Sequence, residues 1–282
     1  MKRVLHRHGS TFLGALACVL AIVCARHACA QVNTEVLRPD RATEGISGDL
    51  DASFAYAHGN VELLDVGGGG RIRYQTLHPV PAVSADEPAP LPYVAQQAFI
   101  LAKGRFAQHG KEAFVSQAFS HARWTAMWIE RVGSELFVQY QYNQFQRLLA
   151  RALGGVGARV EIVHVPACLI WAGTGYMFEY NRIDVLEGAN DSPSSYEHRS
   201  TSYLATRVEL FDSELLLQNT VYLQPRFDKP SDFRLLEEFE AQSKITEVFA
   251  LGVRLGLLHD SAPPTGVKHT DIQIASTLHV SL

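Results

Sequence analysis

Hydrophobic and polar residues alternate along most of this chain, and the pattern is clearest in residues 270–282, TDIQIASTLHVSL. Ile272, Ile274, Leu278 and Val280 share one parity, and mainly polar residues occupy the other. A period of two predicts a β-strand with one apolar and one polar face. A transmembrane barrel pairs its final strand with its first and leaves no edge, so such a strand favours a membrane barrel over a soluble sheet.

The same alternation predicts about twelve strands, an even number as in bacterial single-chain barrels. Most are slightly longer than the roughly 9–11 residues that cross a bilayer as a tilted strand. The predicted strands lie near residues 46–56, 64–75, 95–107, 112–126, 133–146, 148–163, 168–181, 200–212, 214–227, 232–243, 245–258 and 268–282. The predicted fold class is therefore all-β, a transmembrane antiparallel up-and-down β-barrel.

The apolar parities carry almost no charge, and aromatic residues gather near the predicted strand ends. Such positions are typical of the interfacial girdles of membrane barrels. The aromatic positions are Trp124, Tyr140, Tyr142, Tyr176, Phe178 and Tyr180. The alternative is a soluble β-sandwich whose apolar faces turn into a core, which would need shorter strands and more turns.

Two connections interrupt the alternation. Residues 77–93 contain five prolines, which forbid regular pairing, and we interpret them as a plain loop. Residues 181–199 are polar and are expected to form a long extracellular loop. In barrels that recognise a partner, the binding residues commonly lie on such loops. If both termini face the periplasm, the first loop lies on the periplasmic side, where turns are usually short.

The N-terminal stretch predicts a cleaved signal peptide over residues 1–30. Basic residues come first, an apolar run fills residues 12–24, and small residues lead to a cleavage site between Ala30 and Gln31. A membrane anchor helix is the alternative, but it would need about 20 apolar residues. We expect residues 31–44 to be a periplasmic lead-in and residues 45–282 to be the outer-membrane barrel.

Removal of the signal changes the charge and the cysteine content. Four of the 25 Lys and Arg residues leave with it, so 21 remain against 29 Asp and Glu, a net charge of −8. This charge argues against nucleic acid as a partner. Cys168 is then the only cysteine left, so the exported chain has no internal disulfide.

The polar parities place a nearly balanced set of charges inside the predicted barrel. The leading lumen-lining candidates are Arg71, Arg73, Lys103, Arg105, Arg123, Arg151, Arg159, Glu161, Glu179, Arg207, Glu209, Arg254 and Asp271. Further acids on these parities are Asp49, Asp51, Glu135, Glu238 and Glu240. These charges either line a water-filled passage for small ions or solutes, or pair across a narrow interior and plug it.

An enzymatic function is the less favoured alternative. His121, Asn143, Ser116 and Ser120 are the residue types that outer-membrane phospholipases use, but a triad is recognised by geometry, and both serines differ in parity from His121. We therefore assign no catalytic residue. The sequence also lacks H-E-x-x-H and paired cysteines, and we expect neither a metal nor a cofactor.

Several short blocks resemble one known family. The segments NQFQRLLARALGGVGARVEI and GTGYMFEYNRID, together with AFSHARW and HDSAPPTGVKHTD, resemble the putative salt-induced outer-membrane proteins, from about Gly45 to Leu282. The resemblance implies an outer-membrane β-barrel of unassigned activity, with no catalytic residues to carry over. Barrels of this kind commonly end in Phe, whereas this chain ends in Leu282.

The sequence thus predicts a bacterial outer-membrane protein that contacts lipid and the barrel-assembly machinery, the latter through Thr270 to Leu282. The leading function is a passive pore, or an envelope protein linked to salt or osmotic conditions through the resemblance alone. A closed structural barrel is the alternative.

Overall fold

The computed structural model describes residues 44–58, 62–79, 92–246 and 249–280. The predicted signal peptide with its cleavage site at Ala30 and Gln31, nearly all of the predicted lead-in and the terminal Leu282 lie outside these residues. No helix of the described residues is long and apolar enough to cross a membrane.

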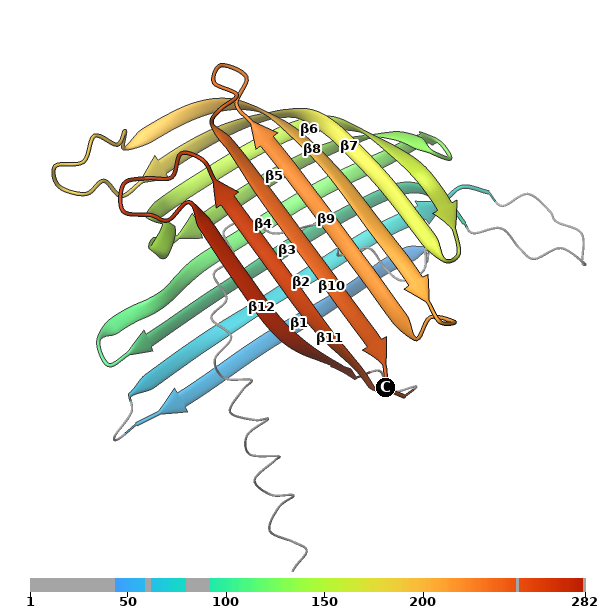
Figure 1. The fold of residues 1–282 in the computed structure, drawn as a ribbon, viewed down its shortest axis with the longest axis horizontal. Coiled ribbons are helices and arrows are strands. Elements are labelled where there is room, and N and C mark those ends of the chain that lie inside the picture. Colours follow the sequence, from blue (N-terminus) through green and yellow to red (C-terminus); the bar gives the residue numbers. More distant parts are fainter. Residues whose placement is uncertain (1–43, 59–61, 80–91, 247–248, 281–282) are drawn as a thin grey trace, which may run out of the picture.

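In the described part of the chain, twelve strands form one antiparallel sheet in which each strand pairs with its neighbours in sequence (Figure 1). They are β1 (Gly45–Ala57), β2 (Leu63–Leu77), β3 (Val94–His109), β4 (Glu112–Ile129), β5 (Val132–Asn143), β6 (Leu148–Val165), β7 (Cys168–Ile183), β8 (Ser194–Leu210), β9 (Leu215–Pro225), β10 (Phe233–Lys244), β11 (Phe249–Asp260) and β12 (Thr270–Val280). The sheet curls until its last strands lie in front of its first strands, which gives the predicted up-and-down β-barrel.

The alternation of residue types explains why these segments are strands that span a membrane. Leu50, Ile72 and Ile274 lie on the outer face with 90%, 65% and 70% of their surface exposed. Glu179 and Arg199 lie on the inner face with 0% and 1% exposed. This distribution is the reverse of a soluble protein, in which large apolar side chains are buried and charges are not. The apolar faces do not form a core, so the soluble sandwich is excluded.

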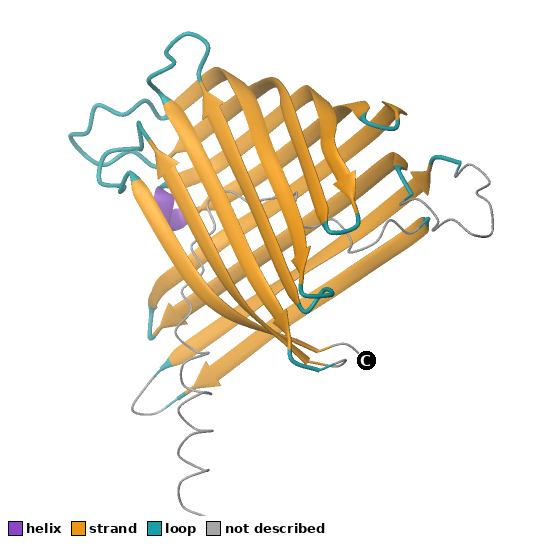
Figure 2. Cartoon of the chain, turned by 45° about the vertical axis from the view of Figure 1, so that its right-hand side comes forward, coloured by secondary structure: helices purple, strands orange, loops and turns teal. Residues whose placement is uncertain are grey.

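Because the sheet is a simple meander, its connections alternate between two ends. One end carries the connections after β5, β7, β9 and β11, and we call it the long-loop end. The other end carries the two-residue turns after β4 and β6, and we call it the short-turn end. A 3-10 helix, η1 (Gln144–Gln146), lies at the long-loop end near the larger loops (Figure 2).

One predicted connection changes once the strands are placed, and the other keeps its place. The expected loop over residues 181–199 shortens to residues 184–193, because β7 runs to Ile183 and β8 already begins at Ser194. Pairing of Tyr180 with Tyr196 and of Asn181 with Ser195 extends the ladder into this polar stretch. The connection over residues 78–93 lies at the short-turn end, as the alternation of the strands requires.

The predicted pairing of the final strand with the first is not formed. Within the described residues the ladder runs from β1 to β12, and no register joins β12 back to β1. Side-chain contacts between non-adjacent strands link β5 with β8, β6 with β8 and β7 with β10, and one further contact joins η1 to β12. In the ladder of the described residues, a seam therefore separates β12 from β1.

Candidate functional site

The most deeply buried acid of the barrel interior is Glu179 on β7, near the long-loop end. Nη1 of Arg234 on β10 donates to both Glu179 carboxylate oxygens at 2.8 Å. Asn181 Nδ2 donates to Oε1 of the same carboxylate at 2.6 Å, and Arg151 Nε lies 3.5 Å from it. Glu179 is thus surrounded by donors from three strands, which compensates the large cost of removing a charge from water.

Arg199 on β8 is the second centre of this interior. Its Nη2 donates to Glu197 Oε2 at 2.6 Å and to Asp232 Oδ1 at 2.8 Å. Its Nη1 donates to the backbone oxygen of Gln224 at 3.0 Å, and its Nε lies 3.9 Å from Glu179. All terminal nitrogens of this buried guanidinium therefore have partners, and Arg199 links the strands on either side of it.

These residues form one network across the inside of the barrel at the long-loop end. We call it the mouth network, and its members are Arg151, Glu179, Glu197, Arg199, Asp232, Arg234 and Asp260. Neighbouring strands lie about 4.8 Å apart, so β7 and β10 are roughly 14 Å apart along the wall. Arg234 and Glu179 can meet only because the wall curls, and their contact crosses the lumen instead of following the sheet.

Above the mouth network, the loop over residues 226–232 holds a further ion pair. Arg226 donates to Asp228 through Nε at 2.9 Å and through Nη2 at 2.5 Å. The hydrogen bonds from this guanidinium lower the pKa of the Asp228 carboxyl from its ordinary value. Arg226 Nη1 also donates to Asp232 at 3.3 Å, so this loop is tied to the network beneath it.

The loop over residues 261–269 is tied to the opposite side of the same end. Arg147 Nη1 donates to the Thr265 backbone oxygen at 2.8 Å, and Asp191 accepts from the Thr265 backbone N–H at 3.0 Å. Beneath the loop, Gln146 Nε2 donates to Asp271 at 3.4 Å. Arg147 follows η1 in a left-handed conformation with φ 56°, which ends the 3-10 turn and directs the chain into β6.

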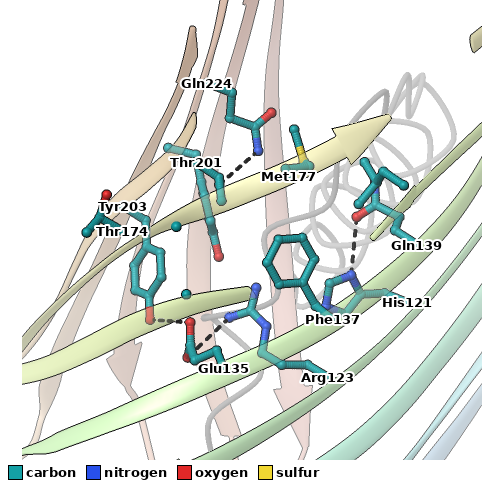
Figure 3. Close-up of a pocket in the computed structure, with 14 residues that line it drawn as sticks. His121, Arg123, Glu135, Phe137, Gln139, Thr174, Met177, Thr201, Tyr203 and Gln224 are labelled. Atoms are coloured by element: carbon teal, nitrogen blue, oxygen red, sulfur yellow. Dashed lines mark hydrogen bonds and ion pairs between the residues drawn. The ribbon is translucent and has the colours of Figure 1, made fainter. Parts of the chain in front are cut away.

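A second polar cluster lies around Glu135 in the middle of the barrel (Figure 3). Glu135 Oε2 accepts from the Tyr203 hydroxyl at 3.0 Å, and Oε1 accepts from Arg159 Nη1 at 3.2 Å. Thr125 Oγ1 donates at 3.4 Å, and Arg123 Nη1 lies at 3.8 Å. β5 and β8 are again separated by two strands, so this contact also crosses the interior.

Glycines on the inner face make these crossings possible. A Cβ on Gly155 would lie 2.6 Å from the Tyr176 backbone oxygen and would collide with the Phe137 ring. A Cβ on Gly173 would collide with the Tyr203 ring, whose hydroxyl it would approach to 2.7 Å. The aromatic rings of β5 and β8 thus lie flat over bare backbone on β6 and β7.

Small cavities lie beside the two polar clusters. A cavity of about 30 Å³ lies beside Arg123, Glu135 and Tyr203. A second cavity, of about 40 Å³, lies under the loop over residues 261–269. A water molecule needs roughly 10–15 Å³ measured in this way, so each cavity holds about three waters.

A comparison of the chain with known proteins identifies its family. Residues 100–282, more than half of the chain, match the family described as "Protein of unknown function, DUF481". The chain belongs to the DUF481 family. The match starts at residue 100, whereas the sequence resemblance was expected from Gly45, and the link to salt remains a prediction.

No curated protein matches this DUF481 protein. A solved structure titled "NanC porin structure in rhombohedral crystal form" is similar over 84% of this chain and 98% of that chain, with a TM-score of 0.41 and 6% sequence identity.

The structure brings several of the predicted interior charges of the DUF481 protein together. Arg123 and Arg159 meet Glu135, and Arg151 meets Glu179. Arg207 pairs with Glu209 at 2.9 Å along one strand, Arg254 pairs with Glu240 at 2.9 Å, and Arg105 pairs with Asp65 at 2.5 Å.

The remaining candidates lie on the inner parity with other contacts. Lys103 Nζ lies 5.7 Å from the centre of the Phe119 ring, and Glu161 pairs with His164 Nδ1 at 2.9 Å. Arg71 and Arg73 share the inner parity of β2, and Arg73 is buried. Asp271 lies at the long-loop end against Gln146.

The residues weighed for hydrolysis in this DUF481 chain have separate structural contacts. His121 is buried among the rings of Phe99, Phe119 and Phe137, and its Nδ1 lies 3.2 Å from the Gln139 amide oxygen. Asn143 Oδ1 accepts from the backbone N–H groups of η1. Ser116 donates to the Tyr142 hydroxyl at 3.3 Å. Each contact is one that orders the barrel. Within the described residues, no group of three or more His, Cys, Asp or Glu could hold a metal ion.

The predicted interior charges include only two of the seven residues of the mouth network, Arg151 and Glu179. Glu197 and Arg199 were placed in a loop, although Tyr196 and His198 alternate with them as a strand would. Arg234 shares its parity with Glu238 and Glu240 and could have been found by the same rule. Asp232 and Asp260 lie at strand ends, where periodicity gives no signal.

Proposed function

We propose that this chain is an outer-membrane β-barrel that forms a normally closed pore for small ions or solutes. The mouth network supports the closed state, because it joins β7, β8 and β10 across the lumen through buried charges that pair with one another. The small cavities support it as well. The periplasmic position of both termini and the extracellular position of the long-loop end belong to this proposal.

For a pore that must both close and open, paired charges are a more suitable closure than an apolar plug. Once water enters, each charge of the mouth network becomes a solvated group that lines the passage, and the nearly balanced signs would orient polar solutes. While water is absent, the same charges must pair, because an isolated buried charge is costly. Closed and open states of one lumen can thus use the same residues.

The salt link from the family resemblance fits this mechanism as part of the proposal. The Arg226–Asp228 pair at the rim is partly exposed, so added salt screens it, whereas the buried pairs are screened far less. We expect the open probability to rise as the ionic strength rises from about 0.1 M to about 1 M, where the screening length falls from about 10 Å to about 3 Å.

Single-channel recording tests the proposal. Residues 31–282, refolded in detergent and added to a planar bilayer, should give rare openings, and a Glu179→Gln, Arg234→Gln double variant should give frequent discrete ohmic steps. A matched control is Glu209→Gln at the short-turn end, which should behave as the original chain does. If both the original chain and the double variant are silent while folded, the protein is the closed structural barrel of the alternative.

A further inference from the structure

The cavity under the loop over residues 261–269 is lined by charged groups of both signs. The contacts of the mouth network take up only part of their hydrogen-bonding capacity. The cavity opens between β6, β10 and β12 at the long-loop end. Arg151, Arg234, Asp260, Lys268 and Asp271 all line it. Arg234 is already held by Glu179 at 2.8 Å and by Asp260 at 3.0 Å, so Arg151, Lys268 and Asp271 are the charged groups with hydrogen-bonding capacity left for a ligand.

The cationic groups of the cavity are Arg151 and Lys268. Arg151 makes both of its polar contacts through Nε, to Asn181 at 2.7 Å and to Glu179 at 3.5 Å. Its two Nη groups have no polar partner among the described residues. Lys268 is exposed at the rim and likewise has no polar partner in the described part of the chain. Planar guanidinium groups with free Nη atoms bind carboxylates well.

The anionic group of the cavity is Asp271. Its Oδ2 accepts only one hydrogen bond, from the Gln146 amide at 3.4 Å, and its Oδ1 has no partner among the described residues. A carboxylate can accept about four hydrogen bonds. The half-buried Asp271 therefore has capacity for a cationic donor that no described residue supplies.

This combination disfavours singly charged ligands on electrostatic grounds. A simple anion bound to Arg151 would face Asp271, and a simple cation bound to Asp271 would face Arg151 and Lys268. We propose that this cavity binds a small zwitterion of the amino-acid class, with its carboxylate on Arg151 and its ammonium group on Asp271. Lys268 supports the carboxylate from the rim.

The walls of the cavity are fixed in advance, which favours binding. Thr265 is held by Arg147 from one side and by Asp191 from the other. His269 Nδ1 donates to the Asp260 backbone oxygen at 3.0 Å, because a carbonyl can only accept. Pro263 and Pro264 restrict the backbone between these points. The loop is thus ordered over the cavity while Lys268 and His269 stay open to solvent.

The inference rests on the proposed function in one respect only: it treats the bound zwitterion as a solute at the mouth of the pore. Binding can be measured on the closed barrel, so silence in the bilayer and failure to bind are separate results. The probe is glycine, titrated calorimetrically into the refolded residues 31–282 in an uncharged detergent. Acetate and methylammonium serve as half-ligands that carry one charge each.

We expect glycine to bind at least tenfold more tightly than acetate or methylammonium, since each charged hydrogen bond contributes about one order of magnitude. Asp271→Asn should weaken glycine binding about tenfold and should bring acetate to the same affinity as glycine. Lys268→Gln should weaken glycine and acetate together. Lys111→Gln, in the turn between β3 and β4, is the matched control and should change neither.

Three results would overturn the inference. Equal binding of glycine and acetate to the original chain would make the cavity an anion site. Equal binding of glycine and methylammonium would make it a cation site. No binding of glycine to a protein that migrates as a folded, heat-modifiable band would mean that the cavity holds water alone.

Discussion

Arg234 Nη1 lies 2.8 Å from both carboxylate oxygens of Glu179, although two further strands separate β10 from β7. A second contact of the same kind joins Tyr203 on β8 to Glu135 on β5 at 3.0 Å. Both pairs cross the inside of the curled sheet. The interior of the barrel is therefore held by contacts between strands that are not neighbours, in addition to the hydrogen-bonded ladder.

The first prediction concerns Glu179. Glu179→Gln leaves Arg234 and Arg199 buried beside a neutral amide, and removing one member of a buried pair costs about 3–5 kcal/mol. We expect the free energy of unfolding in urea to fall by that amount in detergent. Glu209→Gln breaks a partly exposed pair and should cost at most about 1 kcal/mol. Equal effects of the two changes would show that the mouth network adds no stability.

The second prediction uses two adjacent glycines of β6. Gly155→Ala places a methyl group against the Phe137 ring and 2.6 Å from the Tyr176 oxygen, whereas Gly154→Ala meets only ordinary contacts at 3.7 Å. Overpacking of this kind costs about 1–3 kcal/mol. Gly155→Ala should therefore lower the unfolding midpoint clearly, and Gly154→Ala should leave it nearly unchanged. The reverse order would mean that the inner and outer faces of β6 are exchanged.

The third prediction tests the lipid-facing surface on β12. Ile274→Arg puts a charge on the outer face, where an arginine near the bilayer midplane costs about 2–4 kcal/mol. Gln273→Arg puts the same charge on the inner parity, one residue away. The fraction of heat-modifiable, membrane-inserted protein should fall sharply for the first variant only. Equal insertion of both would contradict a lipid-facing Ile274.

The fourth prediction concerns the seam between β12 and β1. Unpaired backbone groups in hydrocarbon cost several kcal/mol each, so we expect the two strands to pair once the protein is in a bilayer. Hydrogen exchange of the β1 amides measures this directly. All amides within β1 should be protected in a bilayer, whereas a seam that stays open would leave alternate amides, those that point away from β2, in fast exchange.

Much of the barrel could be predicted from local pattern. The strand that holds Arg151 and Arg159 was expected over residues 148–163 and runs from Leu148 to Val165, because a period of two needs only neighbouring residues to be recognised. The inner parity of Glu135, Glu179 and Arg207 follows from the same rule. The shortened loop after Ile183 shows its limit, since the polar outer residues near Ser194 hide the alternation.

The sequence by itself determined that this chain forms long strands with one apolar and one charged face, which requires lipid on one side and a polar interior on the other. It could not determine whether that interior is open. Arg234 pairs with Glu179, and Tyr203 with Glu135, across distances that depend on how far the sheet curls. Curvature is a property of all strands together, so only the tertiary structure decided which charges meet across the interior.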